Sequence, residues 1–139
     1  MTDSDQSVVR QTVAPVVAAS DAAARIENLE HIPVSDLLPQ VRALRERGAR
    51  LITLTCLDVG GAFEVIYHFD IDLRMSHLSV QVPAGQRLPS ITGEYFCAFL
   101  VENEISDLFG LQIDGLPVDY RRRLVLTEDG PSRPLLKQR

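Results

Sequence analysis

Apolar residues recur at helical spacing in the stretch VSDLLPQVRALRERGARL, residues 34–51. Leu37, Val41 and Leu44 stand at i, i+4 and i+7, which places them on one face of a helix. Ser35 is the expected N-cap, and Gly48 is the expected end of the helix. The pattern predicts an amphipathic helix that buries one face against a core.

A second helical pattern covers residues 94–109. Its apolar stripe has four members: Ala98, Val101, Ile105 and Leu108. The stretch ENEISDLFG at its end adds three acids, Glu102, Glu104 and Asp107. At about 100° per residue, Glu102 and Glu104 fall on opposite sides of the stripe, and Asp107 lies beside Glu104. These three carboxylates therefore do not converge on one ion.

Between the two helices the pattern changes to alternation, as in strands. In LITLTCLDV, Ile52, Leu54 and Cys56 point to one side. In AFEVIYHFD, four apolar residues share a face: Phe63, Val65, Tyr67 and Phe69. LRMSHLSVQV gives a third strand, and the links DVGG and DID are short. Three successive strands with short links predict an antiparallel meander.

This order of elements predicts an α+β fold. We expect an antiparallel sheet of three to four strands with two main helices packed on one face, followed by an extended C-terminal tail. The domain is expected to span residues 31–127. Residues 1–30 are expected to be a variable segment, helical or disordered. Residues 128–139, with Pro131 and Pro134, are the expected tail.

Composition narrows the class of protein. The chain has 139 residues, of which 45% are hydrophobic, and this fits one globular domain. Its net charge of −5 argues against nucleic acid as the main partner. No apolar run approaches the ~20 residues needed to cross a bilayer, and the start MTDSDQSVVR is acidic where a secretory signal is basic. We expect a cytoplasmic protein that contacts a membrane only through partner subunits.

The sequence offers little for catalysis. Cys56 and Cys97 are too few for an iron–sulfur cluster, which takes about four cysteine ligands, and both are expected to be buried free thiols. A simple hairpin through Ile71 does not place His68 opposite His77. No Glu-x-x-His repeat, nucleophile–histidine arrangement or phosphate loop occurs. We therefore expect no catalytic residue, no cofactor and no metal site.

Two charged segments remain as candidates. The acids of ENEISDLFG are typical either of a solvated face or of an interface in which carboxylates bind arginines or backbone N–H groups. The cluster YRRRL is either a solvated edge or a dock for an acidic partner or for those acids. Phe109 and Gly110 are expected to form a structural corner, because the chain must leave the helix there.

The same segment resembles a known family, the 30 kDa subunit of NADH:quinone oxidoreductase, which is respiratory complex I. Six residues match its Glu-Arg-Glu-x-x-Asp-Leu/Met-Phe-Gly signature: Glu102, Glu104, Asp107, Leu108, Phe109 and Gly110. Downstream, Gly115, Pro117 and the arginines at 121–123 match, and LPSITGEYFCAF resembles its Pro-Ser-Ile-Thr lead-in. The resemblance spans about residues 34–126.

Departures from the signature point to a branch of this family. Asn103 replaces the usual Arg, Ser106 an aromatic residue, and Leu116 the His before Pro117. With the short chain, this pattern is closer to the matching subunit of Ech-type energy-converting, membrane-bound NiFe hydrogenases. The resemblance implies a cofactor-free, non-catalytic structural and assembly subunit of the peripheral arm. It implies as partners the large catalytic subunit and the small iron–sulfur subunit, on the inner face of the cell membrane.

The resemblance also implies roles for the charged residues. The expected partner interface is Glu102, Glu104, Asp107, Arg121, Arg122 and Arg123, and Pro117 joins the structural corner. Two alternatives remain for the function: the 30 kDa subunit of NADH:quinone oxidoreductase itself, and a stand-alone small-molecule binding domain. An enzyme with an unrecognised site is a third.

Overall fold

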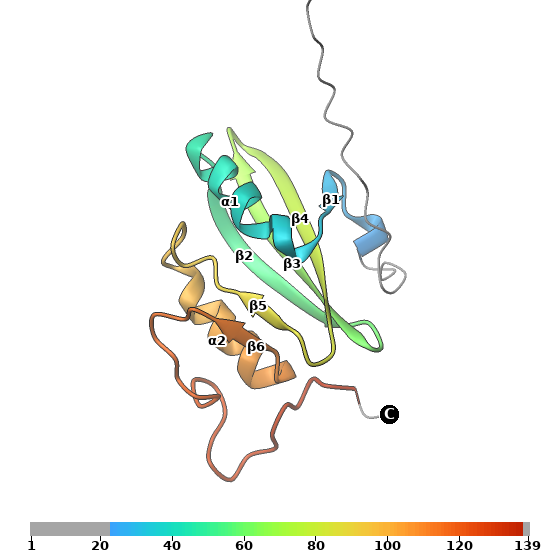
Figure 1. The fold of residues 1–139 in the computed structure, drawn as a ribbon, viewed down its shortest axis with the longest axis vertical. Helices are drawn as coiled ribbons and strands as arrows, with labels where there is room; N and C mark the ends of the chain where they lie inside the picture. Colours follow the sequence, from blue (N-terminus) through green and yellow to red (C-terminus); the bar gives the residue numbers. More distant parts are fainter. Residues whose placement is uncertain (1–22, 138–139) are drawn as a thin grey trace, which may run out of the picture.

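A computed structural model describes residues 23–137 (Figure 1). The strands are β1 (Leu29–His31), β2 (Arg50–Asp58), β3 (Ala62–Ile71), β4 (Arg74–Pro83), β5 (Arg87–Pro89) and β6 (Gln112–Asp114). The helices are α1 (Leu37–Glu46) and α2 (Ala98–Phe109), with 3-10 turns η1 (Ala23–Arg25) and η2 (Val34–Asp36). One sheet has the order β1-β4-β3-β2, and β5 and β6 form a second, parallel pair. The predicted α+β fold is confirmed.

The N-terminal edge of the sheet differs from expectation. Part of the segment predicted as variable, from Leu29 onward, forms β1, which pairs in parallel with β4. Just before it lies η1, a single 3-10 turn. Residues 1–22 of that segment lie outside the described residues. The domain boundary at residue 31 stays a prediction.

The antiparallel meander of β2, β3 and β4 is the centre of the fold. The hairpin between β3 and β4 turns through Asp72 and Leu73, whose φ angles of 51° and 64° are both left-handed, as in a type I′ turn. Ile71 therefore pairs with Arg74, and this pair sets the register of all the other pairs between β3 and β4. The predicted hairpin through Ile71 was wrong, because the turn lies at Asp72 and Leu73 and places His68 opposite His77.

Strand β2 carries an irregularity that the alternation did not reveal. Leu51 pairs with Phe69 and Thr53 with His68, so Ile52 is an extra residue on β2. Ile52 is 49% exposed, whereas Leu54 is 6% exposed. The prediction that Ile52 shares the buried side of Leu54 was therefore wrong.

Both helices contribute to one hydrophobic core against one face of the sheet. Helix α1 contributes Leu37, Val41 and Leu44, as its spacing predicted, and α2 contributes Ala98, Ile105 and Phe109. The sheet contributes alternate residues of its two central strands: Val65, Tyr67, Phe69, Leu78, Val80 and Val82. Each such side chain, when fully buried, contributes about 1.5–3 kcal/mol.

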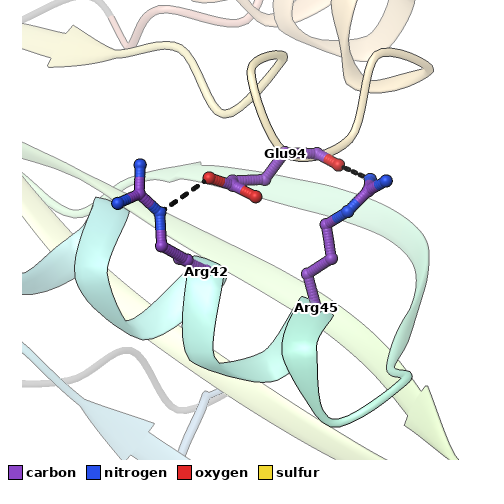
Figure 2. Close-up of polar contacts among 3 residues, drawn as sticks. All are labelled: Arg42, Arg45 and Glu94. Carbon is purple, nitrogen blue, oxygen red and sulfur yellow. Dashed lines mark hydrogen bonds and ion pairs between the residues drawn. The ribbon is translucent and has the colours of Figure 1, made fainter.

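Helix α1 also holds the loop that precedes α2 (Figure 2). Arg42 Nε donates to the Glu94 carboxylate over 3.0 Å, and Arg45 donates to the Glu94 backbone carbonyl. The Arg45 guanidinium lies 5.7 Å from the centre of the Tyr95 ring, and the Tyr95 hydroxyl donates to the Ala49 carbonyl over 2.7 Å. These contacts fix where α2 begins.

Three local predictions need correction. Helix α1 begins at Leu37, and its N-cap residue is Asp36, while Ser35 belongs to the 3-10 turn before it. Helix α2 begins at Ala98 and not at residue 94, because the chain makes turns up to its N-cap residue Cys97. Both cysteines are free, but Cys97 is exposed, so the prediction of burial was wrong for it.

The bulge in β2 gives a matched pair of substitutions. Leu54→Ala should lower the free energy of unfolding by about 2–5 kcal/mol, because it empties a core position. Ile52→Ala should change it by less than about 0.5 kcal/mol, because that side chain faces solvent. Denaturant unfolding of both variants measures the difference, and equal losses would contradict the observed register.

Candidate functional site

Helix α2 buries three polar side chains, which the sequence pattern did not predict. Glu102 and Asp107 are fully buried and Asn103 is 1% exposed, while Glu104 faces solvent. A solvated acidic face is therefore wrong for Glu102 and Asp107. The polar side chains are covered by chain segments that lie before and after the helix, and each binds one of those segments.

Glu102 binds the segment that follows β5. One carboxylate oxygen accepts the backbone N–H of Ile91 over 2.8 Å, and the other accepts the Ser90 hydroxyl over 2.6 Å. Ser90 is in turn 2.7 Å from the Thr92 hydroxyl. Burial raises the pKa of the Glu102 carboxyl, while the two hydrogen bonds oppose that rise. Glu102 thus ties the Ser-Ile-Thr stretch to α2.

Asn103 binds the loop that follows β6. Its amide nitrogen donates to the Val118 carbonyl over 2.8 Å and to the Phe99 carbonyl over 2.7 Å. Its amide oxygen accepts the backbone N–H of Tyr120 over 3.0 Å. One side chain therefore fixes the loop just before the arginine cluster. In the sequence, Asn103 stands out only as a departure from a signature.

Asp107 binds the same loop on the far side of the arginine cluster. One carboxylate oxygen, Oδ2, accepts the backbone N–H of Val125 over 2.8 Å. The other, Oδ1, is buried without a hydrogen-bond partner among the described residues. Asn103 and Asp107 together hold both ends of the segment 120–125, which has no strand or helix of its own.

The three arginines of that segment are exposed. Arg121 and Arg122 both have left-handed backbone, with φ of 52° and 62°, and the Asp119 carboxylate accepts the Arg121 N–H over 2.7 Å. Arg123 forms an ion pair with Glu128. Within residues 23–137 the arginines form no ion pair with Glu102 or Asp107, so the alternative in which those acids dock them is wrong.

A shallow groove of about 490 Å³ lies beside the arginines. It is lined by Arg87, Ser106, Gln112, Ile113, Leu116, Asp119, Arg121 and Arg122. Arg87 donates to the Asp114 carboxylate, and Arg87 Nη1 donates to the Gln112 amide oxygen over 2.8 Å. With Asp114 paired to Arg87 and Asp119 in the lining, three guanidinium groups face two carboxylates, so the groove has a net positive charge.

An apolar patch adjoins the arginine segment. Phe96, just before α2, is 60% exposed and packs against Phe99 with ring centres 5.1 Å apart. Leu100, Val118 and Tyr120 are also exposed. Asn103 binds the backbone of Phe99, Val118 and Tyr120, so these three residues lie close together. Large exposed apolar patches mark sites of interaction with other proteins.

The corner at the end of α2 has the geometry that its sequence requires. The Phe109 ring packs edge-on against Phe63, with centres 6.0 Å apart. Gly110 has φ 76°, and its N–H donates to the Ser106 carbonyl over 2.9 Å. An added Cβ there would collide with the Arg133 side chain. Pro117 lies exposed in the following loop, and its assignment to the corner stays a prediction.

The tail returns to the body of the domain. The Leu135 N–H donates to the Leu108 carbonyl, and the Lys137 N–H donates to the Asp58 carboxylate, both over 2.9 Å. No helix within residues 23–137 is long and apolar enough to span a bilayer. Over the same range, no three His, Cys, Asp or Glu side chains gather as a metal cluster would need.

Comparisons with known proteins agree on the fold. The family model of the respiratory-chain NADH dehydrogenase 30 kDa subunit matches residues 30–139. A chain of the membrane-bound sulfane sulfur reductase (MBS), an archaeal respiratory membrane complex, is similar with a TM-score of 0.65. The two are 21% identical, over 80% of this chain and 69% of that chain, so this likeness shows the fold alone. No curated protein matches the chain.

The buried Glu102 can be tested by a pair of substitutions. Glu102→Ala leaves the Ile91 N–H and the Ser90 hydroxyl without this acceptor, and each unsatisfied group costs about 1–3 kcal/mol. Glu102→Gln keeps an acceptor for Ile91 and offers a donor to Ser90, so it should lose much less. Denaturant unfolding at neutral pH measures both losses. Equal losses would mean that the hydrogen bonds to Ser90 and Ile91 are not what stabilises this site.

The raised pKa of Glu102 predicts a pH dependence. Because the native carboxyl binds its proton more tightly than the unfolded one, the free energy of unfolding falls as pH rises from 4.5, the ordinary value, through the native pKa. Glu102→Gln has no such titration. The stability of the wild type relative to Glu102→Gln should therefore decline across this window, and a flat difference would contradict the burial of the charge.

Proposed function

The chain belongs to the family of the respiratory-chain NADH dehydrogenase 30 kDa subunit, and on this basis we propose that it is a non-catalytic structural and assembly subunit of a membrane-associated oxidoreductase complex. Its partners in this proposal are the large catalytic subunit and the small iron–sulfur subunit of the peripheral arm. The protein then lies on the inner face of the cell membrane and reaches the membrane only through them.

The observation that most supports this proposal is that buried polar side chains of α2 form hydrogen bonds to the backbone of an irregular loop. Asn103 and Asp107 fix an irregular loop, and that loop displays arginines and the exposed Tyr120. An active site instead collects reactive groups in a cleft around a substrate. A rigid, exposed and chemically mixed surface is what such a protein needs in order to dock.

We define the docking surface as Phe96, Leu100, Tyr120, Arg121 and Arg122. Aromatic residues and arginine are enriched at protein interfaces. The chain as a whole carries a charge of −5, so a local concentration of arginines directs it toward an acidic partner. The proposed partner surface is an apolar pocket with carboxylates at its rim. Glu104, exposed on the same helix, stays in the predicted interface.

The finer proposal is an Ech-type energy-converting NiFe hydrogenase, with NADH:quinone oxidoreductase as the alternative complex. Asn103 supports this choice, because its amide is buried and binds three backbone groups of α2 and the loop. Arginine, the usual residue of the complex I signature, has five donors and no acceptor for the Tyr120 N–H. The loop that follows β6 thus depends on Asn103, the residue that belongs to the hydrogenase-like pattern.

Purification of the intact complex through this protein tests both levels of the proposal. Mass spectrometry should find a large subunit with Cys-x-x-Cys pairs near both ends, together with nickel. A related large subunit without those pairs, found with flavin- and NADH-binding subunits, would support the complex I alternative. A chain that purifies alone would contradict the proposal of a subunit role and support the small-molecule binding domain.

Charge reversal tests the docking surface. The double change Arg121→Glu and Arg122→Glu should release the protein from its complex, because truncating or reversing a buried interfacial charge costs about 2–5 kcal/mol of binding. The melting of the isolated domain should change little, since exposed charge substitutions alter stability by under about 0.5 kcal/mol. Co-purification yield and thermal unfolding are the two measurements.

Arg74→Glu is the matched control, because Arg74 is exposed at the hairpin between β3 and β4. It should leave assembly intact. Equal release by the control would show a general charge effect, and retention of the double variant would place the interface elsewhere.

A further inference from the structure

The sheet face opposite the hydrophobic core carries a line of polar side chains on three neighbouring strands. His68 on β3 is opposite His77 on β4, and Thr55, two residues along β2 from the direct partner of His68, reaches it diagonally. His68 Nε2 is 2.8 Å from the Thr55 hydroxyl, and His68 Nδ1 is 2.7 Å from His77 Nδ1. The two imidazole rings meet edge-on, with centres 4.9 Å apart.

The strand register explains why the two histidines meet. His68 and His77 are direct partners across β3 and β4. The backbone N–H of His77 points away from β3, since it donates to the Asn28 carbonyl beside β1 over 3.1 Å. The pair is therefore a non-hydrogen-bonded pair of the β3–β4 ladder, the type in which facing side chains come closest.

From this geometry we infer that His68 and His77 form a binding site for a divalent transition-metal ion, with Cu²⁺ as the best match. Imidazole nitrogen suits such ions, and Cu²⁺ binds most tightly in the first-row series. Nitrogen ligands about 2.0–2.1 Å from one ion are about 2.9 Å apart in adjacent square-planar positions and about 3.4 Å apart in tetrahedral ones. The observed 2.7 Å is nearer to the square-planar value.

The proton balance of binding is simple. In the metal-free pair one Nδ1 carries a hydrogen and the other accepts it. When the ion binds both Nδ1 atoms, that hydrogen moves to the Nε2 of its own ring, so both imidazoles stay neutral and no net proton is released. Two metal–nitrogen bonds form and two metal-bound waters leave. His68 then donates its Nε2–H to Thr55, which is the outer contact typical of a ligating histidine.

The surroundings define the kind of site. No third His, Cys, Asp or Glu joins the pair within residues 23–137, so water fills the remaining positions on the ion. Asp70, two residues along β3 from His68, pairs through Oδ2 with Arg50, and its Oδ1 is buried without a hydrogen-bond partner among the described residues. His77 is only 6% exposed, so an ion reaches the pair from the side of His68, which is partly exposed. We expect an exchangeable site that a chelator empties and not one on which folding depends.

The experiment uses the full chain without an affinity tag, treated with chelator and then titrated with copper(II) chloride alone. Calorimetry should give one equivalent bound, and electron paramagnetic resonance should show two coupled nitrogens. His68→Gln and His77→Gln should each weaken binding more than about tenfold, and Thr55→Val, which removes only the outer contact, by about tenfold. His31→Gln is the matched control and should bind like the wild type.

The proposal is overturned if the wild type does not bind Cu²⁺, if one nitrogen or none is coupled, or if His31→Gln weakens binding as much as the other two. Unchanged binding in His68→Gln or His77→Gln also overturns it. Should either variant fail to fold, proton NMR of the wild type decides. Substoichiometric Cu²⁺ should broaden the ring signals of His68 and His77 before those of His31, and uniform broadening contradicts the site.

Discussion

The C-terminal part of this molecule depends on the cost of burying polar groups. A buried carboxylate or amide without partners destabilises a fold by several kcal/mol, so it must find donors or acceptors nearby. On α2, Glu102, Asn103 and Asp107 find them in the backbone of segments outside the helix. The same bonds satisfy N–H and carbonyl groups that have no strand to pair with. The helix and the loops therefore stabilise each other, and the loops adopt one defined conformation although they contain no helix or strand.

Features that depend on near neighbours in the sequence could be predicted. The apolar spacing of Leu37, Val41 and Leu44 does identify a buried helix face, and alternation identifies β3 and its core side. Features set by long-range pairing could not be predicted. Strand β1 forms only by pairing in parallel with residues of β4 that are almost fifty positions away in the sequence. Asp72 and Leu73 are both left-handed and set the register of the hairpin, but neither is a glycine that would indicate such a turn in the sequence. For this reason the contact between His68 and His77 could not be predicted.

The candidate site shows the same division. The sequence singled out ENEISDLFG correctly as the segment to explain, and a left-handed Gly110 followed from local chain geometry. The surroundings of its acids did not follow. A helical wheel places Glu102 on one side of the apolar stripe and Asp107 beside Glu104 on the other side, and both acids are exposed there only if nothing else covers the helix. The Ser90–Ile91 segment and the loop at Val125 cover them, and neither contact has a signature in the spacing of residues.

The backbone at the arginine cluster adds one argument about which side chains matter. Arg121 and Arg122 are consecutive left-handed residues, a conformation that costs roughly 1–2 kcal/mol per residue outside glycine and that asparagine tolerates better. Within residues 23–137 no contact requires arginine there, because both side chains are exposed and the Asp119 carboxylate binds the backbone N–H of Arg121 and not its guanidinium. Glycine would relieve the strain and keep the turn. Within residues 23–137 the guanidinium groups of Arg121 and Arg122 form no ion pair, so the strained turn leaves both of them available to the partner of the proposed docking surface.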